Sequence, residues 1–255
     1  MSLGPLAGRH ALVTGGGSGI GRATAAALTA SGAVVTVLGR REAALRDTVA
    51  AGQAAFHVAA DVTDEAATVA ATATATEKLG PILLLINAAG AAETGPFHKT
   101  TPAMFERMWR VNVTGAIITT QAALPGMLTA GFGRVVNIAS TASLKGYRYV
   151  SAYVTAKHGL LGFTRALGQE VAGTGVTVNA VCPGFTDTDL VAESLARIVA
   201  RTGRSPEQAL AELTRTNPLG RLIRPEEVAA SVLYLCLPAA AAVNGQALAV
   251  DGGET

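Results

Sequence analysis

A tyrosine and a lysine lie four positions apart, at Tyr153 and Lys157, within a stretch of helical patterning. Residues i and i+4 of a helix face the same side, so we expect the two side chains to lie together. Ser140 precedes them, just past a short apolar run, and Asn112 lies further upstream. A phenol that can give a proton and a hydroxyl that can hold a carbonyl oxygen suit the reduction of a ketone by a hydride donor.

The Lys157 ammonium has an expected electrostatic role in this chemistry. The ordinary pKa of a tyrosine is about 10, which is high for the reverse reaction at neutral pH. We expect Lys157 to lower the pKa of Tyr153, because a nearby positive charge favours phenolate. The same spacing also arises by chance on helix surfaces, so a solvated pair is the alternative interpretation.

A glycine-rich turn follows the first predicted strand and opens the first predicted helix. Its residues are Thr14, Gly15, Gly16, Gly17, Ser18, Gly19, Ile20 and Gly21. Glycines let the backbone come close to a pyrophosphate, and the helix start offers free N–H groups and a positive dipole end. An ordinary turn also favours glycine, but the position in the first strand–helix unit indicates a dinucleotide site.

The end of the second predicted strand indicates which dinucleotide binds. An acidic residue there would accept hydrogen bonds from the ribose 2′-hydroxyl of NAD, but the chain has Gly39, Arg40 and Arg41. Arg40 can form a bidentate pair with a 2′-phosphate. We therefore expect NADP. NAD stays possible, because the two arginines could be solvated residues at a helix start.

The elements that must position these residues alternate along the chain. Strands are predicted over 10–14, 33–38, 54–60, 82–86, 134–138, 176–181 and 246–250, and helices over 22–31, 41–51, 64–78, 101–128, 151–172 and 225–237. This pattern predicts a single α/β domain over residues 1–255, a doubly wound seven-stranded parallel sheet of the Rossmann type with helices on both faces.

One long segment breaks the alternation between strands and helices. Residues 185–221 contain no predicted strand and two short helical patterns, the second opened by Ser205 as cap and Gln208 as capping-box residue. We expect this segment to form a small helical lid, because it follows the carboxyl end of a strand, where such folds bind ligands. A packed surface excursion is the alternative.

Composition narrows the class of protein. The 255 residues are 49% hydrophobic, which excludes wholesale disorder, and the net charge of +2 gives no footprint for nucleic acid. The two cysteines and four histidines form no metal-type cluster, so we expect no metal site. No secretory signal is recognised and the apolar runs are too short to span a bilayer, so we expect a cytoplasmic protein without a membrane partner.

With these motifs in order, the chain resembles the short-chain dehydrogenase/reductase family along nearly its whole length. The matching residues are Thr14-Gly15-x-x-x-Gly19-x-Gly21, Asp61-Val62, Asn87-Ala88-Ala89-Gly90, Asn112, Ser140, Tyr153 with Lys157, Pro183-Gly184 and Asp251-Gly252-Gly253. The spacing of Tyr153 and Lys157 resembles the carbonyl/alcohol branch and not the enoyl reductases. Ala88 departs from the family, which often has a strand-stabilising asparagine there.

The resemblance implies a role for each matching residue. Tyr153 would be the acid/base, Ser140 would orient the carbonyl, Lys157 would bind the nicotinamide ribose, and Asn112 would hold a water that links Lys157 to solvent. The cofactor would contact Gly15, Gly17, Ser18, Gly19, Ile20, Gly21, Arg40, Asp61, Val62, Asn87, Ala88, Gly90, Tyr153, Lys157, Pro183, Gly184 and Thr188.

The segments 140–163 and 178–190 resemble bacterial ketoreductases that act on 3-oxoacyl thioesters, polyketide-like ketones or 3-hydroxy acids. Leu144, Tyr147, Phe185 and Leu190 would form an apolar-walled substrate pocket under the lid. Arg148, Arg197, Arg201 and Arg204 could meet the phosphates of a carrier, although solvated helix arginines are the more ordinary interpretation. The resemblance also implies a homotetramer.

Several functions stay open at this point. The first is an NADP-dependent oxidoreductase that acts on a ketone or secondary alcohol, with an NAD-dependent alcohol dehydrogenase of the same family as the alternative. A serine hydrolase built on Ser140 would lack a G-x-S-x-G elbow and a histidine with an obvious role. A non-catalytic nucleotide-sensing protein would not need Ser140, Tyr153 and Lys157 together.

Overall fold

The computed structural model describes residues 4–255, apart from the side chains of residues 201–202. Its strands are β1 (His10–Thr14), β2 (Val34–Gly39), β3 (Phe56–Ala59), β4 (Ile82–Asn87), β5 (Gly133–Ile138), β6 (Val176–Pro183) and β7 (Ala247–Val250). Its α-helices are α1 (Gly19–Ala30), α2 (Glu42–Ala50), α3 (Glu65–Leu79), α4 (Pro102–Trp109), α5 (Gly115–Ala130), α6 (Ser151–Glu170), α7 (Asp189–Thr202), α8 (Pro206–Thr214) and α9 (Pro225–Cys236).

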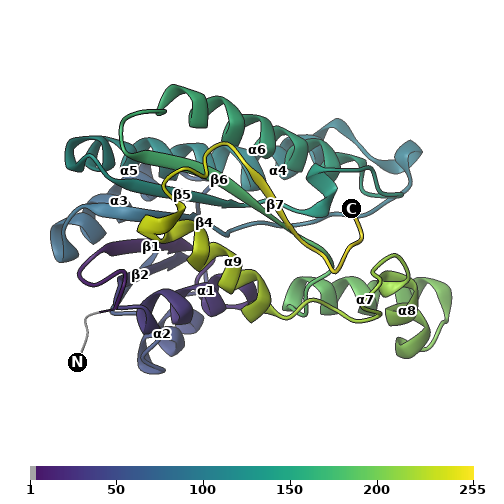
Figure 1. Ribbon diagram of the computed structural model, residues 1–255. Helices are drawn as coiled ribbons and strands as arrows, with labels where there is room; N and C mark the ends of the chain where they lie inside the picture. Colours follow the sequence, from purple (N-terminus) through teal and green to yellow (C-terminus); the bar gives the residue numbers. More distant parts are fainter. Residues whose placement is uncertain (1–3) are drawn as a thin grey trace.

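The predicted sheet is confirmed. Within residues 4–255, seven parallel strands lie in the order β3-β2-β1-β4-β5-β6-β7. Helices α3, α4, α5 and α6 cover one face, and α1, α2 and α9 cover the other (Figure 1). The strand order reverses between β1 and β4, and folds of this kind bind ligands at such a point, beyond the carboxyl ends of the strands.

The strands are buried because helices cover both faces of the sheet. Every residue of β1, β5 and β6 is buried. The core side chains are mostly Val, Leu, Ile and Ala, as expected for a chain with 4% aromatic residues. Continuous apolar strands of this kind are typical of parallel sheets.

The helix predicted over 101–128 is continuous but not uniform. Between α4 and α5 the chain makes a π-helical turn at Arg110–Thr114, which the sequence pattern did not predict. A π turn adds a residue to the helical repeat and re-aims the side chains beside it. Asn112 lies in the middle of this turn and is buried.

The expected lid segment 185–221 contains α7 and α8, which extend beyond the carboxyl ends of the strands (Figure 1). The predicted capping box is present at the start of α8. Ser205 Oγ accepts a hydrogen bond from the Gln208 N–H at 3.3 Å, and the Ser205 N–H donates to Gln208 Oε1 at 3.0 Å. Across residues 4–255, no helix combines the length and the apolar character needed to cross a bilayer.

His10 ties the amino end of β1 to its neighbours. Its Nδ1 lies 2.7 Å from Gly80 O, and its Nε2 lies 2.9 Å from Thr36 Oγ1. A carbonyl oxygen only accepts, so Nδ1 carries a proton. Burial lowers the pKa of His10, and the hydrogen bond to Gly80 offsets part of that effect.

We expect His10 to make stability depend on pH below neutrality. The folded pKa lies below the unfolded value of about 6.5, so stability is lost as the pH falls from 6.5 towards the folded pKa. His10→Gln should flatten the pH dependence of the free energy of unfolding, measured by urea denaturation between pH 7.5 and 5.5. The exposed His98→Gln is the matched control. Equal slopes in His10→Gln and the unchanged protein would contradict this role.

Candidate active site

Ser140 and Tyr153 meet at the carboxyl edge of the sheet. Ser140 directly follows the turn out of β5, and Tyr153 lies in the first turn of α6. A hydrogen bond joins the Ser140 and Tyr153 side chains, and Ser140 Oγ also accepts from the Ala142 N–H at 3.1 Å. Within residues 4–255, the Ser140 side chain bonds to Ala142 and Tyr153 and to no histidine, which disfavours the serine hydrolase alternative.

Lys157 lies one turn further along α6 and points back at the sheet. It is only 4% exposed, and its Nζ donates to Ile138 O at 2.8 Å. The same Nζ lies 5.6 Å from the centroid of the Tyr153 ring. Burial lowers the pKa of Lys157 to about 8, so this ammonium can release its proton near neutral pH.

The expected lowering of the Tyr153 pKa by Lys157 is wrong for this structure. Burial raises the pKa of Tyr153, and the hydrogen bond from Ser140 offsets only part of that increase. The physical reason is desolvation, which disfavours phenolate and ammonium alike. In addition, the Lys157 ammonium gives its short hydrogen bond to Ile138 O and not to the phenol.

Asn112 reaches the same region from the π-helical turn. Its Nδ2 donates to Ala91 O at 2.9 Å and to Met108 O at 3.0 Å. A Cβ added to Gly90 would lie 2.9 Å from Asn112 Oδ1 and 3.7 Å from Lys157 Nζ. Asn112 Oδ1 and Lys157 Nζ therefore both lie close to Gly90, which is exposed.

The glycine turn has the close contacts that a phosphate cradle needs. Gly15 has φ +68°, and an added Cβ there would lie 3.0 Å from the backbone of Ala88. A Cβ on Gly21 would collide with Gly15 O. Gly19 has φ +48° and faces Thr188, whose Cγ2 would lie 2.9 Å from an added Cβ. Side chains would fill this space, so the turn stays open to a ligand only with glycine.

The start of α1 is free to bind an anion. Its N-cap residue Ser18 makes no capping hydrogen bond to the helix, because Ser18 Oγ instead accepts from Arg41 Nη2 at 2.9 Å. Uncapped N–H groups and the helix dipole favour a negatively charged group at this place. Together with the glycines, this arrangement fits the pyrophosphate of a dinucleotide.

Two arginines flank the place where a ribose 2′-phosphate would lie. Arg40 is 75% exposed, and its Nη1 lies 3.9 Å from Asp61 Oδ2. Arg41 contacts both the glycine turn at Ser18 and the start of α7, where its Nη2 lies 3.6 Å from Asp189 Oδ2. Arg41 was not among the cofactor residues expected from the sequence, whereas its neighbour Arg40 was.

Asp61 and Val62 follow β3 at the carboxyl edge of the sheet, where the resemblance leads us to expect the adenine. Asp61 Oδ1 accepts from the Thr63 N–H and hydroxyl at 2.9 and 2.8 Å. Burial would raise the pKa of Asp61, but the hydrogen bonds from Thr63 and the charge of Arg40 lower it. Val62 is buried against Gly115 at the start of α5.

Asn87 has a different position from the one expected of a cofactor contact. Its side chain is buried and bonds to Asn137 Oδ1 at 2.9 Å and Thr119 Oγ1 at 2.7 Å. It therefore joins β4 to β5 and α5. The N–H groups of Ala88 and Ala89 both donate to Thr14 Oγ1 at 3.0 Å, which fixes the 88–90 backbone beside the glycine turn.

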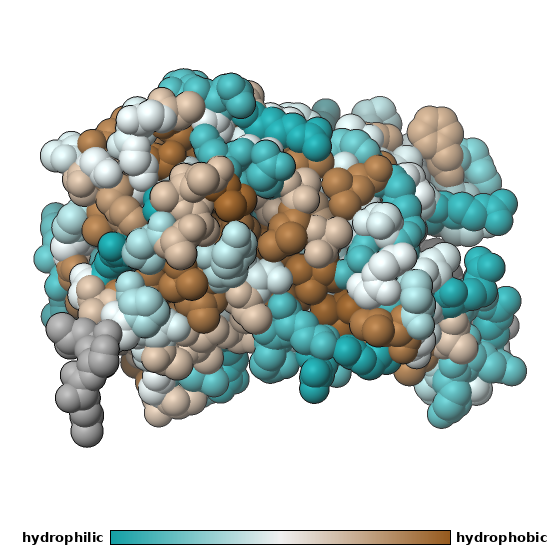
Figure 2. All heavy atoms as spheres, in the orientation of Figure 1, coloured by the Kyte–Doolittle hydropathy of each residue, from teal (hydrophilic) through white to brown (hydrophobic). Residues whose placement is uncertain are grey.

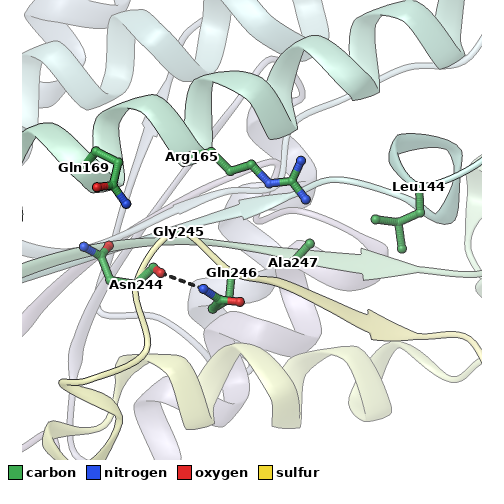
Figure 3. Close-up of a pocket in the computed structure, with 7 residues that line it drawn as sticks. All are labelled: Leu144, Arg165, Gln169, Asn244, Gly245, Gln246 and Ala247. Carbon is green, nitrogen blue, oxygen red and sulfur yellow. Dashed lines mark hydrogen bonds between the residues drawn. The ribbon is translucent and has the colours of Figure 1, made fainter.

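The four residues expected to line the substrate pocket are brought together only in part. The Tyr147 and Phe185 rings pack edge to face, with centroids 6.2 Å apart and planes at 81°. Leu190 is exposed on α7. Leu144 lines a separate cavity of about 490 Å³ between α6 and the 244–247 segment, beside Arg165 (Figure 3). None of Ser140, Tyr153 and Lys157 lines that cavity.

The carrier-facing arginines are dispersed. Arg197 pairs with Glu193 on its own helix at 3.6 Å, and Arg204 lies 3.9 Å from Glu212. Arg148 is exposed on the loop before α6. The side chain of Arg201 lies outside the described residues. These placements give no common phosphate site.

Comparison with known proteins agrees with this geometry. Residues 9–198 match the short chain dehydrogenase family. The chain is 41% identical over 249 residues, 95% of each chain, to a Streptomyces coelicolor protein that carries the name ketoacyl reductase. It is 38% identical over 254 residues to the D-beta-hydroxybutyrate dehydrogenase of Cupriavidus necator, covering 97% of this chain and 98% of that one.

A solved structure has the same fold along the full length of the chain. It is a variant of the actinorhodin polyketide ketoreductase with NADPH, and it is 38% identical. The TM-score is 0.93, with 99% of both chains covered. The order of the motifs, the sheet topology and the matched sequence lead to one conclusion: the chain belongs to the short-chain dehydrogenase family.

Proposed function

We propose that this protein is an oxidoreductase that transfers a hydride between NADP(H) and a ketone or secondary alcohol. The observation that carries the proposal is the placement of Ser140, Tyr153 and Lys157 at one edge of the sheet, beside an open glycine turn. The family and the NADPH-containing relative support the same reaction and cofactor. The test follows NADPH and NADH absorbance over a panel of ketones, diketones and 3-oxoacyl thioesters. Consumption of NADPH that depends on an added substrate supports the proposal, and unchanged absorbance with every substrate would refute it.

The chemistry divides between the chain and its cofactor. When bound, the nicotinamide supplies the hydride. Ser140 and Tyr153 hydrogen-bond the carbonyl oxygen, and Tyr153 delivers the proton as charge develops on that oxygen. The raised pKa of Tyr153 suits proton donation in the reducing direction.

Lys157 restores the proton that Tyr153 gives. Its pKa of about 8 lets it exchange protons near neutral pH, and Asn112 lies near it at Gly90. A water held by Asn112 in that space would connect Lys157 to solvent. Lys157 also holds the nicotinamide ribose in this scheme.

The cofactor residues follow from the same scheme. The pyrophosphate binds at Gly15, Gly17, Ser18, Gly19, Ile20 and Gly21, the 2′-phosphate at Arg40 and Arg41, the adenine at Asp61 and Val62, and the nicotinamide along Ala88, Gly90, Pro183, Gly184 and Thr188. Asn87 supports this surface from below through its buried hydrogen bonds.

The substrate is a 3-oxoacyl thioester, a polyketide-like ketone or a 3-hydroxy acid. Relatives named for ketoacyl, polyketide and hydroxybutyrate chemistry support this range. The rings of Tyr147 and Phe185 form one wall of the pocket. We call this pair of rings the substrate wall, and the segment 185–221 forms the lid. Leu190 on α7 extends the apolar lining when the lid closes.

The protein works as a homotetramer in this proposal. β7 is an outer strand of the sheet, so one side of its backbone has no strand partner within residues 4–255. Figure 2 shows apolar residues gathered at the front of the molecule, where Figure 1 places β7 and α9. A second apolar surface lies between α4 and α6, where a cavity of about 570 Å³ includes Phe105 and the half-exposed Trp109.

A cytoplasmic location completes the proposal. Cys182 and Cys236 are both free and buried. Unpaired buried cysteines are typical of proteins from reducing compartments.

Tyr153→Phe should abolish turnover while NADPH binding is retained. Loss of the proton donor is expected to lower kcat by about 10²- to 10⁴-fold. NADPH absorbance measures turnover, and quenching or transfer of NADPH fluorescence measures binding. Tyr234→Phe, at an exposed tyrosine on α9, is the matched control and should behave like the unchanged protein. An unchanged kcat in Tyr153→Phe would refute the assignment of Tyr153 as the proton donor.

Arg40→Ala and Arg41→Ala should each weaken NADPH binding by about tenfold, because each removes a charge-assisted hydrogen bond to the 2′-phosphate. The Kd for NADH should change less than twofold. Arg46→Ala removes a guanidinium that pairs with Glu42 on α2 at 2.7 Å, and it serves as the control. Parallel losses for NADPH and NADH would show that the arginines do not read the 2′-phosphate.

Ala249→Glu should weaken the assembly. Ala249 is the exposed residue of β7, and a carboxylate there would face its own copy across a strand-to-strand contact. Analytical ultracentrifugation of the unchanged protein should give a tetramer, and the variant should shift towards smaller species. A monomer in the unchanged protein would refute the tetramer.

A further inference from the structure

Glu254 is a buried acid that belongs to no motif considered above. Its side chain is 1% exposed. Its Oε1 accepts hydrogen bonds from the Tyr147 hydroxyl at 2.7 Å and the Thr216 hydroxyl at 2.8 Å. Lys145 Nζ lies 3.1 Å from the same oxygen and also donates to the Glu254 backbone carbonyl at 3.0 Å. One carboxylate therefore joins the loop after β5 to the segment 185–221.

The segment 251–255 is held in the shape that presents Glu254. Asp251 accepts hydrogen bonds from the N–H groups of Gly253 and Thr255, each at 3.0 Å. Gly252 has φ +72°, and an added Cβ there would collide with Asn217 of the segment 185–221. The tight fit means that the 251–255 backbone and the 216–219 backbone constrain one another.

The contact with Tyr147 fixes an aromatic ring of the substrate wall. A carboxylate only accepts, so the Tyr147 phenol must donate a hydrogen bond to Glu254, and the Thr141 hydroxyl, 2.8 Å away, must donate to the phenol oxygen. The ring is thus held at two points while its edge packs on Phe185. Thr141 directly follows Ser140, so this network borders the reacting groups.

The second carboxylate oxygen of Glu254 indicates that the burial of this side chain is not optimal for the stability of the fold. Glu254 Oε2 is buried and has no hydrogen-bond partner in the described chain. It lies 3.6 Å from the position that a Cβ of Gly184 would take. A buried acceptor without a donor costs free energy, so a purely structural explanation for this acid is incomplete.

We propose that Glu254 is a positioning residue that determines substrate specificity, because it fixes Tyr147 against Phe185 and ties this substrate wall to the lid at Thr216. The inference rests on the proposed function and adds a residue to it. Glu254 acts through Tyr147 and does not touch the reacting atoms. A bulky ketone that fills the space up to the substrate wall depends on this arrangement, whereas a small ketone held by Ser140 and Tyr153 depends on it less.

The test is Glu254→Met, which keeps the volume of the side chain and removes the acceptor. We compare a small ketone, ethyl acetoacetate, with a bulky bicyclic ketone, 1-tetralone. The ratio of kcat/KM for the bulky ketone to that for the small ketone should fall by about tenfold, mainly through KM, as expected for the loss of a charge-assisted hydrogen bond. Glu254→Gln retains an acceptor oxygen and should recover most of the ratio.

A double-mutant cycle with Tyr147→Phe tests whether Glu254 works through Tyr147. In the Tyr147→Phe background, Glu254→Met should change the ratio by less than twofold, because the hydrogen bond is already absent. Glu77→Met is the control, since it makes the same change at an exposed acid of α3 and leaves Tyr147 untouched. Equal losses for both ketones in Glu254→Met, or additive effects in the cycle, would overturn the proposal.

Hydrogen exchange provides a readout that does not need turnover. Glu254→Met should speed amide exchange both in peptides over 141–150 and in peptides over 214–220, whereas Glu77→Met should affect neither. Unchanged exchange in those peptides would overturn the coupling even if ketones are reduced. Failure of the unchanged protein to reduce any ketone would instead refute the proposed function, and the exchange data would still decide whether Glu254 joins the two segments.

Discussion

The arrangement of the site depends on keeping the Lys157 ammonium buried. Its one short hydrogen bond goes to Ile138 O at the end of β5, so the helix that carries Tyr153 is fastened to the strand that precedes Ser140. Burying a lysine is costly, and the cost appears here as a pKa of about 8. In exchange, the phenol, the serine and the amine share one edge of the sheet.

The rest of the fold supports that edge. Asn87, Asn137 and Thr164 form a buried chain of hydrogen bonds that joins β4, β5 and α6 below the site. The π-helical turn brings Asn112 to Gly90, close to Lys157. These polar groups are buried but bonded, so they fix the relative positions of elements that apolar packing alone would leave free to shift.

Strand pattern and ordered motifs predicted most of the fold and the core of the site. All seven strands were expected, as was the meeting of Ser140, Tyr153 and Lys157, because periodicity and local spacing report on short-range geometry. The π-helical turn, the contact of Arg41 with Ser18 and the position of Leu144 were not foreseen. Each depends on how side chains pack between segments that are distant in sequence, and no local pattern records this.

Burial, which no local pattern records, also explains why the pKa of Tyr153 is raised and not lowered as expected. The sequence predicts a positive charge of Lys157 beside Tyr153. In the structure, burial raises the pKa of Tyr153, and the Lys157 ammonium donates its hydrogen bond to Ile138 O. Glu254 was overlooked because its partners Tyr147 and Thr216 are far from it in the chain. Charge and distance along the sequence do not reveal desolvation.

The strand order divides the molecule into two halves with separate tasks. The groups expected to recognise the adenine, the 2′-phosphate and the pyrophosphate follow β1, β2 and β3, whereas most of the groups that would meet the nicotinamide and the carbonyl compound follow β5, β6 and β7. Substitutions in one half should add almost independently to the effects of substitutions in the other half on the free energies of binding and catalysis. The reason is that few of these side chains share a partner. An ancestral protein could therefore have altered its redox partner and its choice of metabolite along separate evolutionary routes, without disturbing the framework that both halves share.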